Sequence, residues 1–527
     1  MPSRSCNASN GPATAQVTLA TLQSALAQGY LHSTAANASV IQVKRHKKIT
    51  PIALAPYPHA LDSGKVEYNG QARWKLGRQG DYLQASWLRL ELSEVVSGLT
   101  PGAENGYIRY CHNLAHSLID CLELSFTGIA GVTFDEFFLD FFSAFTVPAS
   151  KRNAYDNMIG NLPELVNPVY RRSVGAGQTA MGSQVLPAAV LNLPLPMPYT
   201  RETGVSLPTG SLIYNDVIVE AHFRDYTDVL VVSNPTNALL GSINANSSRK
   251  AVAADITGTP TLSGDLWGTY IVVTSDERKR MGKLPRDAVW ENVQTMPDVT
   301  VLSSANDIEV PLRYSHAVKA ILFALRNKTV DSDRANYTTR EPLSRFNVAG
   351  AAGLTTLEFP APNAFDPIEQ ACLRYEGSVV FDMPVDYFSM VQPFLYARAV
   401  PTVTGYHLWS YSLDMGSADS FGSADHGKLT NVNLNLTLSE DCIAALTAAV
   451  VTPFVDEYGQ DSALPPGYAD LRSDIAWIEA GLGGGTLINM VGANGFNLVA
   501  QKFEAHNAAI AHTVIRYIGG AAGFPIF

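Results

Sequence analysis

The feature that most constrains this chain is a repeated alternation of apolar and polar side chains along short segments. Apolar side chains recur at every second position in residues 88–92, 217–224 and 432–438. Such alternation buries one face of a strand and turns the other toward solvent or a neighbour, as in antiparallel sheets. Turn-rich stretches containing Gly, Pro, Asn and Ser separate these segments, at Val174–Gly182, Pro235–Ser248 and Gly416–Gly427. We therefore predict an all-β chain of sandwiches or barrels with few short helices.

The length of the chain predicts more than one core. Domains hold roughly 100–200 residues, so 527 residues indicate two to four of them. A small-residue stretch, Ala251–Gly264, precedes a fresh strand pattern at Trp267–Thr274. We place the boundary there, which leaves two parts that are each long enough for a sandwich. The expected domains are an N-terminal arm (1–50), a first sandwich (51–255) and a second sandwich (256–527).

Two segments predict helices. Six phenylalanines recur at helical spacing and form one stripe, which is typical of a core-facing helix. Thr133 and Glu136 have the spacing of a capping box, and Pro148 follows the expected end. A second short helix is expected after Thr274, with Glu277 three residues on. We interpret the stripe as a buried plug over one end of a barrel. Its members are Phe134, Phe137, Phe138, Phe141, Phe142 and Phe145.

Charge argues against a nucleic-acid-binding surface. Lys and Arg number 37 against 48 Asp and Glu, so the net charge is −11, whereas phosphate neutralisation needs a basic excess. Charged residues make up only 16% of the chain, against roughly 25% in typical soluble domains. A surface so poor in charge indicates that partners cover much of it. The basic run Lys44–Lys48 fits either a solvated loop or a contact with nucleic acid or an anionic membrane.

Membrane and export signals are not expected. The longest apolar stretch, Cys442–Val455, is too short for a bilayer, and the first residues do not form an apolar signal segment. The cysteines are few and odd in number, and they lack C-x-x-C spacing, which indicates a reducing compartment without disulfides or a zinc cluster. They are Cys6, Cys111, Cys121, Cys372 and Cys442.

A search for chemistry predicts no catalytic, cofactor-binding or metal-binding residues. His112 and His116 are four residues apart, but the segment lacks the glutamate of the metalloprotease motif. On the strand expected here, the two side chains would also be too far apart to share a metal ion. The glycines at 481–485 lack the Lys-Ser/Thr of a phosphate loop. Acidic neighbours such as Asp135/Glu136 and Asp456/Glu457 do not flank a cleft. Six N-x-S/T sites are weak evidence for glycosylation, at Asn7, Asn37, Asn246, Asn327, Asn336 and Asn435.

Short motifs occur in a fixed order through most of the chain. In the first half they are Arg78-Gln79-Gly80-Asp81, Leu114-Ala115-His116-Ser117-Leu118-Ile119 with Glu123, Lys151-Arg152 with Tyr155, Met158, Ile159 and Gly160, and Leu207-Pro208 with Tyr214, Val217, Val219, Phe223 and Arg224. In the second half they are Tyr270 with Glu277, Arg278 and Arg280, Gln392-Pro393 with Pro401, Trp409-Ser410-Tyr411-Ser412-Leu413, and Val514-Ile515-Arg516 with Gly519, Gly520 and Gly523.

These motifs resemble those of the major capsid proteins of nucleo-cytoplasmic large DNA viruses, the group that contains iridoviruses and phycodnaviruses. The first motif is similar to the family's R-x-G-D, and the second to its I-G-H-A-L-I, with Ala115 in place of glycine. The phenylalanine helix lies where the family has an aromatic helix. The family's P-S-G…N-F-S-R is replaced here by Phe421-Gly422-Ser423 and Ala424–Gly427. The resemblance covers roughly residues 50–527.

The resemblance implies a double jelly roll, two tandem eight-stranded sandwiches, in a non-enzymatic structural protein. Three copies would form a pseudo-hexagonal capsomer of an icosahedral shell. The implied partners are the chain itself, neighbouring capsomers, minor capsid proteins and, through the arm, an inner membrane, without direct contact to nucleic acid. The implied location is the virion capsid, assembled in the host cytoplasm. Independently of the resemblance, the apolar run at 514–518 and the glycines after it predict that residues 512–527 add the final strand of the second sandwich.

Two other classes of protein remain open. One is a minor capsid protein of the same kind of virus, although the two-domain length favours the major protein. The other is a carbohydrate-binding or carbohydrate-active β-sandwich protein, whose paired carboxylates or aromatic platform would assemble from distant loops.

Overall fold

The structure is a computed structural model whose chain divides into two units, Met1–Ile52 and Ala53–Phe527. The described residues all belong to the second unit. They are 53–527 except 100–106, 128, 167–184, 234–247, 284, 303–304, 340–365, 402, 420, 448–453, 456–460, 463–500 and 525–527. The predicted arm (1–50) with its basic run, the acidic pair at 456–457 and the glycines at 481–485 lie outside the described residues.

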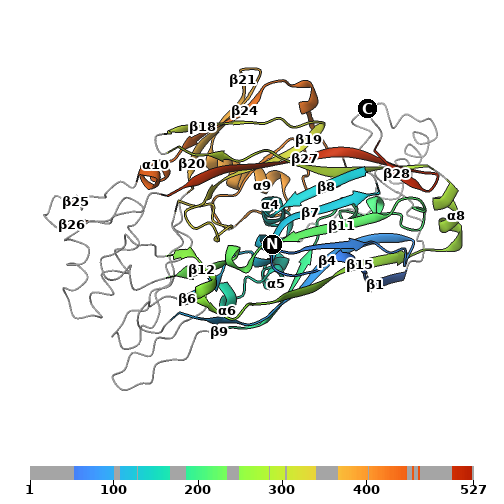
Figure 1. The fold of residues 1–527 in the computed structure, drawn as a ribbon. Coiled ribbons are helices and arrows are strands. Elements are labelled where there is room, and N and C mark those ends of the chain that lie inside the picture. The colour runs from blue at the N-terminus through green and yellow to red at the C-terminus, as the bar shows by residue number, and fades with distance from the viewer. Residues whose placement is uncertain are drawn as a thin grey trace, which may run out of the picture. The chain divides into compact units, whose positions relative to one another are not determined.

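The first sandwich consists of two facing antiparallel sheets (Figure 1). One has the order β1-β15-β4-β10, and the other the order β2-β3-β11-β7-β8. The strands of the first sheet are β1 (Ala53–Pro58), β15 (Leu262–Val272), β4 (Tyr82–Leu92) and β10 (Ala189–Pro194). Those of the second are β2 (Leu61–Gly64), β3 (Gln71–Lys75), β11 (Val217–Phe223), β7 (Ile119–Phe126) and β8 (Ile129–Asp135).

Short sheets complete this part of the chain. One joins β13 (Ser248–Lys250), β12 (Leu230–Ser233) and β6 (Tyr107–Tyr110), and another joins β14 (Ile256–Thr257), β5 (Val95–Ser97) and β9 (Val185–Leu186).

The second sandwich also has two sheets. The first contains β16 (Arg286–Thr295), β27 (Phe503–Ile518), β19 (Ala317–Asn327) and β22 (His407–Ser410), with β17 (Val299–Thr300) and β28 (Ala521–Gly523) paired to β27 and β23 (Ala424–Asp425) paired to β19. The second contains β18 (Asp307–Pro311), β24 (Val432–Leu438), β20 (Ile368–Tyr375) and β21 (Ser378–Pro384). A two-stranded ribbon pairs β25 (Phe454–Val455) with β26 (Asp461–Ser462).

The predicted alternation is confirmed in all three segments. In β11 and β24, buried and half-buried residues alternate along the whole strand. In β4, Leu88, Leu90 and Leu92 are buried while Arg89 and Glu91 are not. The mostly β fold therefore follows from the side-chain period of two.

The sheet formed by β16, β27, β19 and β22 is buried on both faces. From β19, Ile321 and Phe323 join the core of the second sandwich. The alternate residues, Leu322 and Ala324, join the core that continues into the first sandwich. Figure 1 shows β27 and β19 running between the strands of the two sandwiches. A strand with two buried faces is apolar throughout, as the Ala-Ile-Leu-Phe-Ala-Leu run of β19 is.

The strands at residues 256–272 pair with strands of the first sandwich. β14 pairs with β5, and β15 pairs with both β4 and β1 over most of its length. Residues 256–272 thus belong by pairing to the first sandwich, although 256 was the expected start of the second. The small-residue stretch before β15 is a connection within the first sandwich.

The helices are few and short among the described residues. The α-helices are α3 (Leu114–Ser117), α4 (Glu136–Thr146), α5 (Ala149–Ile159), α6 (Pro163–Val166), α8 (Ser275–Lys283), α9 (Gln392–Tyr396) and α10 (Glu440–Thr447). The 3-10 helices are η3 (Pro198–Thr200), η4 (Thr203–Val205), η5 (Tyr226–Asp228), η6 (Ala253–Asp255) and η9 (His426–Lys428), and η8 (Tyr387–Val391) is a π-helix. The helix expected after Thr274 is α8. None of the helices described here has both the length and the apolar composition needed to span a bilayer.

The last long strand is central in its sheet. β27 begins at Phe503, earlier than expected, and pairs with β16 on one side and β19 on the other. Of the expected segment 512–527, residues 512–518 complete β27, and Ala521–Gly523 form β28, which folds back on it. The second half of β27 also contributes the buried Ile515 and Tyr517 to the core.

Truncation after Ala511 should therefore abolish folding of the second sandwich. The deletion leaves much of β16 without a partner and opens the core at Ile515, a loss of backbone pairing and of packing together. Thermal unfolding and the yield of soluble protein measure the effect. Arg516→Ala is the matched control, because this side chain is half exposed and pairs with the equally exposed Asp287. A truncated chain that melts like the full-length chain would contradict the central placement of β27.

Candidate functional site

The phenylalanine helix lies between the two sandwiches and contacts both. It forms α4, in which residues 137–145 are all buried. The Phe138 ring stacks on Phe134 of β8, with ring centroids 5.5 Å apart. The Phe141 ring lies 4.6 Å from Tyr406, just before β22 of the second sandwich. The expected burial is confirmed, but α4 is shared by both sandwiches and does not close one end of a single barrel.

The N-terminal cap of α4 is Asp135. Its Oδ1 accepts a hydrogen bond from the Phe138 N–H at 2.7 Å. The predicted cap, Thr133, lies in β8, because the strand continues to residue 135 before the helix begins. Burial raises the pKa of Asp135 to about 6, although the bond from the Phe138 N–H favours the ionised carboxylate.

Glu136, the first residue of α4, pairs with three guanidinium groups. Arg326 Nη1 and Arg334 Nη1 each lie 2.9 Å from Oε1, and Arg224 Nη1 contacts Oε2. Arg224 follows β11 of the first sandwich, whereas Arg326 belongs to β19 of the second. Burial alone would raise the pKa of Glu136, but the three positive charges outweigh it and hold the pKa below its ordinary value. One carboxylate thus ties the two sandwiches together.

A second buried network is centred on Glu291 of β16. Lys319 Nζ, which is fully buried on β19, lies 2.6 Å from Glu291 Oε1, and Arg201 Nε lies 2.6 Å from Oε2. The Arg201 guanidinium also lies 3.6 Å from the centre of the Phe142 ring. Burial would raise the pKa of Glu291, but the charges of Arg201 and Lys319 outweigh it and lower the pKa. This pairing also joins the two sandwiches.

A third network contains the histidine of the L-A-H-S motif. His116 Nε2 lies 2.8 Å from the Tyr155 hydroxyl. Asp140 of α4 accepts hydrogen bonds from Asn113 Nδ2 at 2.6 Å and from the Tyr406 hydroxyl at 3.1 Å. The Asp140 carboxylate and the His116 ring are both buried, with Oδ1 3.8 Å from Nδ1. The burial of the His116 ring and of the Asp140 carboxylate among other side chains indicates a structural role.

The prediction of a strand around His112 and His116 is wrong. Residues 114–117 form α3, which begins after Asn113 in the left-handed conformation (φ 52°). His116 is buried and His112 is exposed. The two imidazoles therefore lie in different surroundings, and the structure does not group them as ligands of one metal ion.

The first motif of the chain joins a turn to α8. Both carboxylate oxygens of Asp81 accept from Arg278, at 2.7 and 3.0 Å, and one accepts from the Val273 N–H at 2.8 Å. Gly80 is required by close packing, because a Cβ there would lie 2.7 Å from the Cβ of Tyr270. The R-x-G-D sequence thus fixes where β15 ends and α8 begins.

Glycosylation at Asn327 would require unfolding. Its side chain is buried, and its Nδ2 donates to the Thr338 carbonyl at 3.0 Å and to Gln501 Oε1 at 2.8 Å. Asn336 Oδ1 accepts from the Thr338 N–H and hydroxyl within a turn. The sites Asn7, Asn37 and Asn246 lie outside the described residues. Cys111, Cys121 and Cys372 are not joined in disulfides.

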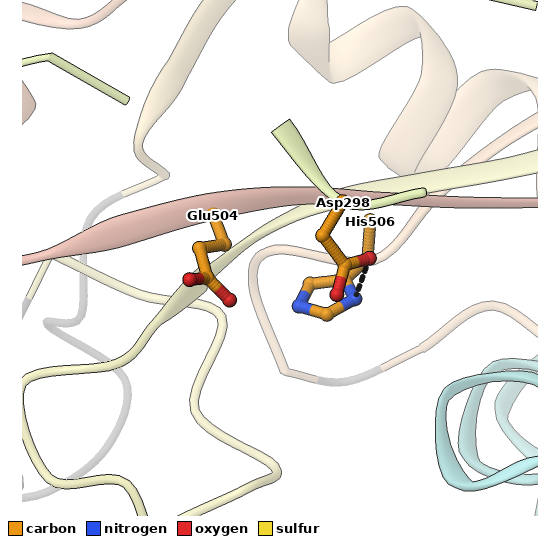
Figure 2. A group of neighbouring side chains, drawn as sticks. All are labelled: Asp298, Glu504 and His506. Atoms are coloured by element: carbon orange, nitrogen blue, oxygen red, sulfur yellow. Dashed lines mark ion pairs between the residues drawn. The ribbon is translucent and has the colours of Figure 1, made fainter. Parts of the chain in front are cut away.

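One group of side chains among the described residues has donors that could hold a metal ion. Asp298, Glu504 and His506 each offer one ligand atom, and these atoms lie within 4.8 Å of one another. Figure 2 shows the two carboxylates converging on the imidazole ring. Asp298 Oδ1 lies 2.7 Å from His506 Nδ1, while Lys328 Nζ lies 3.0 Å from both oxygens of Glu504.

Sequence reasoning missed this group because Asp298 is more than 200 residues from its neighbours. The available signal was the alternation of Glu504 and His506 with apolar residues, which places both on one face of a strand.

An exposed apolar surface lies on η8 and α9. We define the apolar patch as Met390, Val391, Phe394 and Leu395, of which Phe394 is 77% and Met390 64% exposed. The end of α9 is held against the following segment by a hydrogen bond from the Met415 N–H to the Tyr396 carbonyl at 2.9 Å. Large contiguous apolar surfaces mark interaction sites.

Comparison with known families and proteins gives a consistent result. Residues 41–272 match the family described as "Major capsid protein N-terminus", and residues 277–460 match "Large eukaryotic DNA virus major capsid protein". The "Major capsid protein" of Tipula iridescent virus is 38% identical over 407 residues, 76% of this chain and 83% of the relative. That of Invertebrate iridescent virus 6 is 34% identical over 490 residues, 92% of each chain. The chain belongs to the major capsid protein family of large eukaryotic DNA viruses.

Solved structures of capsid proteins share the fold. PBCV-1 VP54, fitted into a reconstruction of the virophage Sputnik, has a TM-score of 0.62 at 17% identity and covers 92% of this chain and 99% of its own. The Faustovirus major capsid protein has a TM-score of 0.58 at 10% identity, over 95% of this chain and 98% of its own. The predicted family and the predicted double jelly roll are confirmed.

Within the capsid protein fold, the charged networks around α4 hold the two jelly rolls together. Glu136→Gln should lower the free energy of unfolding at pH 7 by about 3–5 kcal/mol, because it removes the carboxylate charge that pairs with the buried Arg326 guanidinium. The ordinary pKa of glutamate is 4.5 and that of Glu136 is lower. Its contribution to stability is therefore present above pH 4.5 and is lost as the pH falls through the lowered pKa.

Urea unfolding of wild type and variant across pH measures this difference. Glu91→Gln is the matched control, because Glu91 is an exposed partner of Arg89 within one strand and such pairs contribute little. Equal stability of Glu136→Gln and wild type at pH 7 would contradict the role of the network.

Asp135→Asn should act in the opposite direction. The folded-state pKa of Asp135, about 6, lies above the ordinary 3.8, so ionisation of this group destabilises the fold above pH 6, and protonation relieves the penalty as the pH falls toward 4. Asparagine caps helices as well as aspartate does. We expect a higher melting temperature than wild type at pH 8 and an equal one near pH 4, measured by calorimetry. A lower melting temperature at pH 8 would show that the ionised cap stabilises α4.

Proposed function

We propose that this chain is a structural major capsid protein that assembles as a homotrimer, three copies forming a pseudo-hexagonal capsomer of an icosahedral shell. The observation that carries the proposal is membership of the major capsid protein family over most of the chain. Two jelly rolls in each of three copies would supply six similar sandwiches around a threefold axis. Closed cyclic symmetry of this kind is usual for homo-oligomers.

The apolar patch supports self-assembly. Four large apolar side chains of η8 and α9 face away from the core of the chain. We propose that a second copy of the chain covers them within the trimer, because a capsid protein meets mostly copies of itself. Burial of roughly 25 cal/mol per Å² of apolar surface would favour that contact.

Strand pairing supports a domain boundary after β15. We propose that the first jelly roll extends to Val272, the last residue of β15, and that the second begins after α8. The two family matches meet in the same interval, between residues 272 and 277. The N-terminal arm (1–50) remains a proposal from sequence.

The remaining partners are proposals of the same kind. Neighbouring capsomers and minor capsid proteins would contact the outer surfaces of the trimer, and the arm with Lys44–Lys48 would approach an inner membrane. A net charge of −11 favours no direct contact with nucleic acid. The protein would be assembled in the host cytoplasm and would function in the virion capsid. The family's name favours the major over the minor capsid protein.

An enzymatic role is not proposed. The buried carboxylates Glu136, Glu291 and Asp140 are each satisfied by cations or hydrogen-bond donors of the chain itself. A glycoside hydrolase needs two carboxylates that face a substrate across a cleft. These three support a structural role because their charges are already used to hold the fold.

Light scattering of the purified chain should return three times its mass of 56.8 kDa. Phe394→Ser should lower the trimer fraction at a given concentration, since it removes the most exposed side chain of the apolar patch from a contact between copies. Leu302→Ser is the matched control, because Leu302 is 69% exposed and lies outside the patch.

The two parts of the proposal fail separately. A monomeric wild type across a wide concentration range would contradict the trimer. A trimer that is equally stable in wild type and Phe394→Ser would keep the trimer and remove the patch from its interface.

A further inference from the structure

We propose that Asp298, Glu504 and His506 form a binding site for a divalent transition-metal ion, with Zn²⁺ as the best match. Imidazole and carboxylate ligands together suit zinc and its neighbours in the first transition row. The three ligand atoms lie within 4.8 Å of one another. They converge from two segments of the second jelly roll, as Figure 2 shows. The proposal is independent of trimer formation.

Strand register brings the three residues together. Glu504 and His506 are two apart on β27, so their side chains leave the same face of the strand. Asp298 directly precedes β17, whose Val299 and Thr300 pair with Ala505 and Glu504. The Phe137 ring of α4 stacks on the imidazole, with centroids 5.6 Å apart and planes 24° apart. The backbone therefore brings the three residues together before any ion binds, and the aromatic contact holds the imidazole.

His506 has one nitrogen that the protein leaves unsatisfied. Asp298 Oδ1 pairs with Nδ1 at 2.7 Å, whereas Nε2 is buried without a hydrogen-bond partner. A buried polar atom without a partner costs free energy, which a metal ion bound to it would recover. In Figure 2 this nitrogen points toward the Glu504 carboxylate. Carboxylate-supported imidazoles are common in metal sites, because the carboxylate orients the ring.

Asp298 serves the site either as a ligand or as the group that orients the ring. Its side chain is 45% exposed and can turn, so its carboxylate reaches the ion directly or keeps the Nδ1 hydrogen bond. Both arrangements need the Asp298 charge. The partial exposure also leaves room for water to complete the coordination.

Lys328 competes with the ion for Glu504. Its ammonium group lies 3.0 Å from both carboxylate oxygens and neutralises the charge that a cation needs. The Lys328 side chain is 39% exposed, so it can swing into solvent when an ion binds. Removing this ammonium should therefore strengthen metal binding, a result that a purely structural ion-pair cluster would not give.

Metal binding would join the connection between β16 and β17 to the beginning of β27. An ion that binds the folded state and not the unfolded chain raises stability in proportion to the logarithm of its concentration over Kd. Occupancy of the site thus becomes visible as a shift in the melting temperature as well as in direct titration.

The experiment is a titration of the full chain, stripped with a chelator, by Zn²⁺ alone. Calorimetry gives the stoichiometry and Kd, and thermal unfolding with and without Zn²⁺ gives the stabilisation. The variants are His506→Gln, Asp298→Asn and Lys328→Met. His222→Gln is the matched control, because His222 also lies two residues from a glutamate on a strand, 3.2 Å from Glu220, without a third donor grouped with it among the described residues.

The expected result is saturation at one ion per chain and a raised melting temperature. Binding should be weakened about tenfold to hundredfold or more in Asp298→Asn and His506→Gln, unchanged in His222→Gln and tighter in Lys328→Met. Variants that melt like the wild type in chelator show that the loss is not misfolding. Should His506→Gln fail to fold, the half-exposed Asp298→Asn still decides.

Three outcomes would overturn the proposal. One is no saturable Zn²⁺ binding by the wild type. Another is equal binding by wild type and Asp298→Asn, which would place the ion on other groups. The third is unchanged or weaker binding by Lys328→Met, which would remove Glu504 from the ligands.

Discussion

The fold depends on one sheet that is buried on both faces. β19 and β27 are the central strands of one sheet of the second jelly roll. The side chains on one face of this sheet join the core of the second jelly roll, and those on the other face join the core that continues into the first jelly roll. A jelly roll ordinarily covers only the inner faces of its two sheets. Here the outer face of one sheet would be an apolar surface exposed to water if the first jelly roll were absent. The two sandwiches are therefore mutually dependent parts of one structure.

Charge makes this junction specific. Apolar contact alone tolerates sliding, because burial depends on area and has little direction. The ion pairs of Glu136 with Arg326 and of Glu291 with Arg201 each join a residue of one jelly roll to a residue of the other. A displacement that broke them would leave buried charges unpaired, which costs several kcal/mol. The networks thus select one relative position of the sandwiches, while the rings of α4 add apolar contact with both.

The sequence was sufficient for the features that depend on local periodicity. The strands at 88–92, 217–223 and 432–438 alternate as expected. Five of the six phenylalanines of the stripe lie in a buried helix, whereas Phe134 lies in β8. Side-chain direction repeats every 2 or 3.6 residues, so local periodicity was enough to predict these features. Tertiary context decided what was missed. α3 replaced an expected strand around His116, and β15 joined the first sandwich, because strand pairing is not encoded locally. The sequence also could not show that Asp298 meets His506, since β17 and β27 are brought together only by pairing across some 200 residues.

The low charge content takes on a different meaning once the buried pairs are known. Only 16% of residues are charged, and several of these charges are inside the protein, among them Lys319, Arg326 and Asp333. The surface is therefore still poorer in charge than the composition suggests. Buried pairs contribute specificity between the jelly rolls, but they cannot repel a neighbouring molecule as surface charges do. The chain thus buries several of its charges and leaves phenylalanine and methionine exposed on η8 and α9. Such a surface is suited to close contact with copies of the chain, because few charges need to be desolvated when two of these surfaces meet.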